Sequence, residues 1–271
     1  MTRLHRYLRR ISYGGPLSPS RQTLRNLHRA HVLAIPFENL DIQLGVRRSF
    51  DLDTVFEKIV DERRGGWCYE MNGLFAWALR ELGFTVDLVA GAVNREKNGN
   101  AALMNHLVLI VRLDQPFLAD VGFGNGMLTP TPLHEGFFSD GRFEFRLTRS
   151  GDWWRFHNHR QNGSTYDFTE EPRAFEDFEP KARLLATTAE SPFVQNLIAA
   201  KLTDRGMITL TNSALQIQSD SGMSEESAPN AEALARILKE HFDLETDRMD
   251  ALWPRVASQH KTWLRKRIRG F

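Results

Sequence analysis

The one cysteine of the chain, Cys68, follows the double glycine Gly65-Gly66 and opens a predicted helix. A thiol at a helix N-terminus lies near the positive end of the helix dipole, which favours the nucleophilic thiolate. A lone cysteine is more often a small buried apolar residue. The double glycine and the start of the helix favour the reactive alternative here. We therefore predict covalent catalysis at Cys68.

His106 and Asp120 are the residues that could activate this thiol. A cysteine nucleophile needs a nearby base, and the base needs a third group that orients it. His106 begins an apolar predicted strand, and Asp120 lies at the end of the next one. An aspartate in such a strand is costly to bury unless it is paired or hydrogen-bonded. We expect His106 to accept the Cys68 proton and Asp120 to hold the imidazole.

The spacing of the two strands brings His106 and Asp120 toward one end of a hairpin. If the chain turns at Asp114-Gln115, counting symmetrically about the turn places His106 opposite residue 123. That position is close to Asp120, so the hairpin is consistent with contact between the two side chains.

A glycine-rich loop, Gly122–Gly126, follows Asp120 directly. Alternating glycines let the backbone approach a ligand closely, and their N–H groups can form a concave site for a pyrophosphate. Glycine loops also simply turn chains, but the position beside the expected nucleophile favours binding. We predict that Gly124 and Gly126 contact an anionic cosubstrate.

The other histidines carry no motif, with one partial exception. His157 and His159 alternate on a predicted strand, a spacing that resembles a pair of metal ligands. No matching carboxylate cluster is evident in the sequence, so we predict no metal site.

The composition argues against several other classes of protein. The chain has 271 residues, of which 41% are hydrophobic and 25% charged, as in an ordinary globular protein. The net charge of +1 gives no general reason to bind nucleic acid or a membrane surface. A single cysteine forms no intramolecular disulfide, and no apolar window reaches the ~18 residues of a spanning helix. We expect a cytoplasmic protein.

A basic segment, Lys261–Arg269, lies near the end of the sequence. It is typical of a solvated helix end whose cations complement the helix dipole. The alternative is a patch that helps to hold an anionic ligand such as a nucleotide phosphate.

The order of the expected elements predicts an α+β fold. Residues 1–83 have the pattern of helices, one of which starts at Ser18–Arg21 with a proline at its first helical position. Residues 84–190 have the pattern of short strands between turns, which predicts a small antiparallel sheet or barrel. Residues 191–271 mix both kinds of element. Such segregation favours α+β over a wound parallel sheet.

The last hundred residues have the least regular pattern. Asn230 is predicted to cap a helix that runs to about Phe242, and helical spacing resumes at Val256. The other expectations are an irregular connector at Pro172–Pro180, a helix over Pro192–Lys201, one or two strands within Met207–Ile217 and a loop at Ser219–Pro229.

Three motifs in register resemble those of one family, the arylamine N-acetyltransferases. They are Ile35–Asp41, Arg64–Glu70 and Ala119–Gly124, and their order and spacing fit the shorter bacterial type. Three motifs in register are far more specific than any one of them. The resemblance spans roughly residues 5 to 220.

The resemblance implies a fold of three parts around a papain-like cysteine triad. It places the triad at Cys68, His106 and Asp120, in agreement with the reasoning from the residues. The three parts are a helical bundle at residues 1–83, a central antiparallel β-barrel at 84–190, and an inter-domain helix with an α/β lid at 191–271.

Further positions receive a role through the resemblance. These roles are structural support of the Cys68 loop for Glu38 and Arg64, the wall of an acceptor pocket for Phe37 and Phe123, and the border of a coenzyme cleft for Phe193 and Thr209. Flat apolar walls suit an aromatic ring.

The resemblance also implies a reaction. The donor is acetyl-CoA, the acceptor is an arylamine, arylhydrazine or N-hydroxyarylamine, and the activity belongs to xenobiotic metabolism. We expect a ping-pong mechanism through acetyl-Cys68. A monomer is expected, with a homodimer as the alternative.

Two other functions use the same residues. A cysteine hydrolase or transglutaminase-like enzyme would pass acyl groups to water or act on amides. A binding module would keep the fold without catalysis, although an intact triad argues against it. The lifetime of the acyl-enzyme without an amine distinguishes the first alternative, and the reactivity of Cys68 distinguishes the second.

Overall fold

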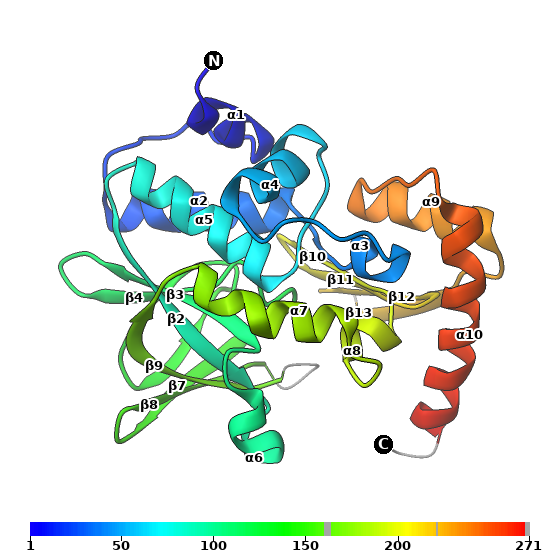
Figure 1. The fold of residues 1–271 in the computed structure, drawn as a ribbon. Coiled ribbons are helices and arrows are strands. Elements are labelled where there is room, and N and C mark those ends of the chain that lie inside the picture. The colour runs from blue at the N-terminus through cyan, green and yellow to red at the C-terminus, as the bar shows by residue number, and fades with distance from the viewer. Residues whose placement is uncertain (160–163, 221, 269–271) are drawn as a thin grey trace.

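The computed structural model describes residues 1–159, 164–220 and 222–268. Figure 1 shows helices from the first third of the chain above a strongly curled sheet, with a second sheet and the C-terminal helices beside it. The α+β class predicted from the sequence is confirmed.

The N-terminal part is helical, as predicted. Helix α2 (Arg21–Ala34) begins where Ser20 accepts a hydrogen bond from the Thr23 amide, one of the free N–H groups of the first turn. Pro19 therefore precedes the cap, and the prediction of a proline at the first helical position is wrong. The other elements are α1 (Arg3–Arg10), α3 (Leu40–Leu44), α4 (Leu52–Phe56), the π-helical turn η1 (Glu57–Asp61) and α5 (Cys68–Glu81).

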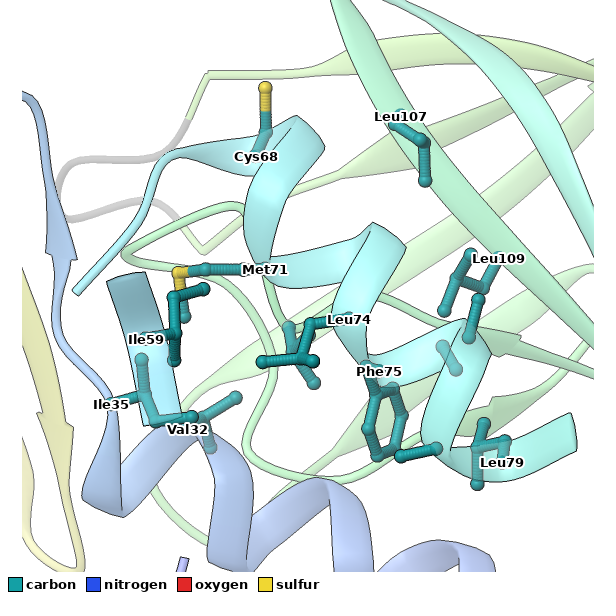
Figure 2. Packing of buried hydrophobic residues seen from close by; sticks show 14 of the residues in the cluster. Val32, Ile35, Ile59, Cys68, Met71, Leu74, Phe75, Leu79, Leu107 and Leu109 are labelled. Carbon is teal, nitrogen blue, oxygen red and sulfur yellow. The ribbon is translucent and has the colours of Figure 1, made fainter. Parts of the chain in front are cut away.

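Helix α5 is the central helix of this part. Figure 2 shows Met71 and Leu74 on α5 in one cluster with Val32 of α2 and with Leu107 and Leu109 of the curled sheet. All five side chains are buried, and each large apolar side chain removed from water contributes about 1.5–3 kcal/mol. This packing on two sides makes α5 a firm support for the residue at its N-terminus.

The middle of the chain forms an eight-stranded antiparallel sheet that curls into a nearly closed barrel (Figure 1). Strand β3 is buried almost throughout, because α5 packs against it and neighbouring strands pair with both of its edges. In the order β5-β4-β3-β2-β9-β8-β7-β6, the strands are β5 (Thr131–Pro132), β4 (Pro116–Ala119), β3 (His106–Arg112), β2 (Thr85–Val93), β9 (Tyr166–Arg173), β8 (Trp153–His157), β7 (Glu144–Ser150) and β6 (Gly136–Ser139). The short helices α6 (Arg95–Asn98) and η2 (Gly99–Ala102) connect β2 to β3.

The β3–β4 hairpin determines how two predicted triad residues meet. Leu109 pairs with Ala119, and continuing this register places His106 opposite Gly122. The count from the sequence was off by one residue. A slip of one residue turns a side chain to the other face of the sheet, so the observed register is the one that directs His106 and Asp120 to the same face.

A second antiparallel sheet lies beside the barrel (Figure 1). Its first strand, β1, comes from the N-terminal part and pairs with β10, so the motif Ile35–Asp41 joins two distant parts of the chain. The strands in order are β1 (Phe37–Glu38), β10 (Ile198–Thr203), β11 (Gly206–Thr211), β12 (Ala214–Ser219) and β13 (Gly222–Ser227). The strands predicted within Met207–Ile217 are thus confirmed.

Two predictions near this sheet are wrong. The helix expected over Pro192–Lys201 ends at Gln195 as the short α8 (Pro192–Gln195), because the chain from Ile198 onward pairs with β11. The loop expected at Ser219–Pro229 contains β13, an exposed edge strand that pairs with β12. Residue 221 lies outside the described residues.

The connector expected at Pro172–Pro180 is also more regular than predicted. It comprises the end of β9, the 3₁₀ turn η3 (Glu176–Phe178) and the first residues of α7 (Glu179–Thr187). Figure 1 shows α7 passing in front of the barrel toward the second sheet.

Two helices, α9 (Ala231–Phe242) and α10 (Met249–Ile268), end the described chain. Asn230 caps α9 as predicted, with its Oδ1 accepting from the Ala233 amide at 2.9 Å. Helix α10 begins before Val256 and contains Pro254. No helix of residues 1–159, 164–220 and 222–268 is long and apolar enough to cross a membrane.

The basic segment near the C-terminus belongs to the exposed end of α10. Arg267 donates to both carboxylate oxygens of Glu225 on β13, at 2.8 and 3.0 Å. Arg269 lies outside the described residues.

Candidate active site

Cys68 is the first residue of α5 and lines a cleft of about 720 Å³. The residue is only 3% exposed, yet Figure 2 shows its side chain directed away from Met71 and Leu74. Glu70 caps the helix, because its Oε2 accepts from the Trp67 amide at 3.1 Å. The first amides of a helix have no partner within the helix, so the positive end of the α5 dipole lies at the thiol.

His106 and Asp120 form a buried pair in which Nε2 donates to Oδ2 at 2.8 Å. Burial by itself would lower the pKa of His106, but the charge of Asp120, the hydrogen bond to it and the interaction with Cys68 raise that pKa to about 10. Burial would likewise raise the pKa of Asp120, but the charge and hydrogen bond of His106 lower it below its usual value. At neutral pH the pair is an imidazolium and a carboxylate.

The thiol of Cys68 lies within hydrogen-bonding reach of the same imidazole. Because Nε2 is bonded to Asp120, Nδ1 is the nitrogen that remains for the sulfur. A positive imidazole beside a thiol favours the thiolate. The rings of Phe123 and Tyr166 flank His106, with centroids 5.0 and 5.1 Å from its own, and restrict its rotation.

Asn72, one helical turn after Cys68, is a site residue that the sequence analysis missed. Its Nδ2 donates to Asp120 Oδ1 at 2.8 Å and to the Leu107 carbonyl at 2.7 Å. Its Oδ1 accepts from the Val121 amide at 2.9 Å. One buried amide therefore joins α5 to both strands of the hairpin. A polar residue four positions after the cysteine, on the same face of an apolar helix, was the available signal.

Gly122 lies against the backbone of Cys68. A Cβ atom at this position would be 2.8 Å from the Cys68 Cα and 2.7 Å from Asn72 Nδ2, closer than real contacts allow. The Gly122 amide also donates to Asp120 Oδ1 at 3.0 Å. The first glycine of the loop thus permits the close approach of loop and helix.

The pair of Glu38 and Arg64 indicated by the resemblance is present. Arg64 donates from Nη2 and Nε to Glu38 Oε1, at 2.8 and 3.2 Å. Glu38 is fully buried, and its Oε2 accepts from the Leu40 amide at 2.6 Å. The pair links β1 to the loop that precedes Cys68.

Lys58 of η1 is a second buried cation at this place, which the sequence analysis missed. Its Nζ donates to Glu70 at 2.8 and 3.1 Å and lies 3.4 Å from Asp41 and 3.8 Å from Glu38. Burial would lower the pKa of Lys58, but these three carboxylates outweigh burial and raise it. Lys58 therefore remains charged and balances the acidic groups beneath the start of α5.

Most of the predicted site residues line the cleft. The rings of Phe37 and Phe193 lie 6.4 Å apart and supply apolar walls. Gly126 is the exception: it lies behind Phe123 and borders a small internal cavity instead. The cleft-lining residues among those predicted are Phe37, Cys68, His106, Phe123, Gly124, Phe193 and Thr209.

The two histidines with metal-like spacing have separate partners. His157 Nε2 and Thr148 Oγ1 lie 2.9 Å apart, and His159 Nε2 donates to the Asn125 carbonyl at 3.1 Å. Within the described part of the chain, no group of three or more His, Cys, Asp and Glu side chains could hold a metal ion.

Comparison with known proteins places this geometry in a family. Residues 20–251 match a family model described as N-acetyltransferase. An arylamine N-acetyltransferase of Escherichia coli (strain K12) is 34% identical over 253 residues, which cover 90% of this chain and 89% of that protein. The chain belongs to the arylamine N-acetyltransferase family. The family indicated by the three sequence motifs and its class, the acyltransferases, are thus confirmed.

Two further relatives of this family extend the comparison. The arylamine N-acetyltransferase of Mycolicibacterium smegmatis is 38% identical over 226 residues, covering 78% of this chain and 80% of that protein. The structure of Mycobacterium marinum arylamine N-acetyltransferase in complex with CoA aligns with a TM-score of 0.86 at 31% identity, covering 93% of this chain and 98% of that one.

Gly122→Ala tests the close packing between the loop and the cysteine. The added methyl group must push the loop away from Cys68, so alkylation of Cys68 by iodoacetamide should slow by about 10- to 100-fold, as small misplacements do. Gly126→Ala is the matched control, because its Cβ would press on the Phe123 side chain. Equal alkylation rates in both variants, followed by mass spectrometry, would contradict this account of Gly122.

Lys58→Met tests the buried charge cluster. Losing the cation leaves the carboxylates of Glu38, Asp41 and Glu70 close together, so the free energy of unfolding in urea should fall by about 3–5 kcal/mol. The double variant Lys58→Met, Glu70→Gln removes one of the stranded charges and should recover part of that loss. An unchanged urea midpoint for Lys58→Met would show that the cluster does not need its cation.

Proposed function

We propose that this protein transfers an acetyl group from acetyl-CoA to an arylamine, arylhydrazine or N-hydroxyarylamine through a thioester on Cys68. The observation that carries the proposal is the continuous line from Cys68 through His106 to Asp120 at the wall of the cleft. A nucleophile, a base and an orienting carboxylate in this order are the parts that acyl transfer requires.

In the first half-reaction, the Cys68 thiolate attacks the thioester carbonyl of acetyl-CoA. The negative charge that develops on the carbonyl oxygen is stabilised by backbone N–H groups, among them the Cys68 amide at the start of α5. Collapse of this intermediate breaks the bond to the CoA sulfur. The imidazolium of His106 supplies the proton that the CoA thiolate takes up, leaving acetyl-Cys68 and a neutral His106.

In the second half-reaction, the amine attacks the acetyl-Cys68 carbonyl. Neutral His106 removes the proton that the nitrogen loses as the new amide bond forms. Collapse releases the Cys68 thiolate beside a protonated His106, which restores the starting state. Asp120 stabilises the imidazolium each time it forms. One base therefore serves both halves of a ping-pong cycle.

The walls of the cleft support the two proposed substrates. Phe37, Phe123 and Phe193 offer flat apolar surfaces beside the thiol, which suit the aromatic ring of an acceptor. The M. marinum relative was determined in complex with CoA, which supports CoA as the donor here. We propose that Gly124 and Thr209 border its path, whereas Gly126 is set back behind Phe123.

We further propose a division of labour between three segments. Residues 1–83 present the nucleophile, residues 84–190 present His106 and Asp120, and residues 191–271 form a lid that shapes the cleft. A cysteine at a helix start facing a histidine on a sheet is the arrangement of a papain-like core. Since all three triad residues come from one chain, a monomer is sufficient for the reaction.

The first test is to mix the purified protein with acetyl-CoA and weigh it intact by mass spectrometry. Wild type should gain one acetyl group that an aromatic amine removes, because the thioester is the proposed intermediate. Cys68→Ser should gain none and should lose at least about 10⁴-fold in turnover, as expected when a thiolate nucleophile is removed. Substantial turnover by this variant would refute the role of Cys68.

The same experiment separates the alternative functions. Free CoA without a protein adduct would indicate a thioester hydrolase, because water would then discharge the acyl-enzyme quickly. Intact acetyl-CoA and unmodified protein would indicate a different donor or a binding protein.

Asp120→Asn tests the imidazolium. The Asp120 carboxylate helps to raise the pKa of His106 to about 10, so its loss should lower that pKa and leave less imidazolium at neutral pH. Without that cation the thiolate is less populated, and alkylation of Cys68 at pH 7 should slow by about tenfold or more while the pH profile moves upward. A profile identical to that of wild type would exclude a charged His106 as the thiolate's partner.

A further inference from the structure

His28 of α2 contacts both ends of the segment that runs from Asp120 to Leu128. Its side chain is fully buried. Its Nδ1 lies 3.1 Å from the Leu128 carbonyl oxygen, and its Nε2 lies 3.2 Å from the backbone nitrogen of Asp120. The sequence analysis found no motif at His28, and none of the three motifs of the family resemblance includes it.

The two partners of His28 determine where its proton sits. A backbone N–H can only donate, so Nε2 must be the unprotonated nitrogen, and a carbonyl can only accept, so Nδ1 carries the hydrogen. Burial lowers the pKa of His28 to about 4, and the contacts with Leu128 and Asp120 offset only part of this effect. The ring is therefore a neutral bridge with one donor and one acceptor, each facing a backbone group.

The bridged segment carries two parts of the site. Asp120 supplies the carboxylate that pairs with His106, and Phe123 forms a wall of the cleft. At the far end, the Leu128 amide donates to Asp140 Oδ2 at 2.8 Å. Asn72 holds the side chain of Asp120, whereas His28 holds its backbone.

We propose that His28 is a positioning residue for acyl transfer. By holding the backbone of Asp120, it keeps that carboxylate aligned with His106 and so maintains the imidazolium beside the Cys68 thiolate. By holding Leu128, it keeps the Phe123 wall at the cleft. The inference rests on the proposed function for the meaning of this alignment, but the alignment itself is measurable without any substrate.

Two substitutions separate the two hydrogen bonds. In His28→Gln the amide oxygen reaches the place of Nε2 and can still accept from Asp120, whereas in His28→Asn the amide nitrogen reaches only the place of Nδ1 and can still donate to Leu128. Alkylation of Cys68 by iodoacetamide at pH 7 should slow by about tenfold in His28→Asn, with the pH profile displaced upward as in Asp120→Asn. His28→Gln should remain within about threefold of wild type.

His31 provides the matched control. It lies one turn further along α2, is fully buried and packs against the same Phe75 ring as His28. Its Nδ1 is 2.8 Å from Tyr7 Oη, a partner outside the bridged segment. His31→Asn should lower the melting temperature, because it disturbs the same core, but should leave the alkylation profile unchanged.

Several results would overturn the proposal. They are a wild-type alkylation profile in His28→Asn, equal slowing in the Gln and Asn variants, or the same displacement in His31→Asn. If His28→Asn does not fold, ¹⁵N NMR of the wild-type ring decides: the proposal requires the Nδ1–H tautomer at pH 7, and the Nε2–H tautomer or an imidazolium would refute it.

Failure of the proposed function would look different. In that case wild type would take up no acetyl group from acetyl-CoA, whatever the His28 variants do to the iodoacetamide profile. A displaced profile in His28→Asn together with a normal acetyl adduct in wild type is the combination that supports both proposals.

Discussion

The buried ion pair between His106 and Asp120 is the interaction on which the rest of the site depends. Removing two charges from water costs more than their attraction returns, unless hydrogen bonds satisfy the remaining lone pairs. Asn72 and the Gly122 amide supply such bonds to Asp120 Oδ1, and His28 fixes the backbone. These partners come from two helices and a loop, so the charged pair is stable only where all three meet the barrel.

A second buried cluster supports the nucleophile from below. Lys58 and Glu70 lie beneath the start of α5, and Glu38 and Arg64 tie the loop before Cys68 to β1. The apolar residues of α5 separate this cluster from the pair of His106 and Asp120 (Figure 2). Because protein interiors are closely packed, that apolar layer determines the distance between thiol and imidazole. Polar networks on both sides and a rigid helix between them keep the reacting groups in place.

Acid–base chemistry and substrate binding share one segment of chain. Asp120 belongs to the charged pair, Gly122 packs on the Cys68 backbone, and Phe123 and Gly124 line the cleft. Anything that moves this segment therefore changes proton transfer and the cleft wall together. Membership of the arylamine N-acetyltransferase family agrees with such an arrangement, since the thioester and the amine must reach the same sulfur in turn.

The sequence by itself determined the helix start at Cys68, the α+β class and the family, because caps, glycines and apolar runs are local signals. Only the tertiary structure decided the hairpin register, which counting missed by one residue, and the strand at Ile198, which depends on pairing with β1 and β11. It also decided the roles of His28, Asn72 and Lys58. A buried polar residue acquires its role from the partners it meets, and these partners lie on segments distant in the sequence, so no local pattern could reveal them.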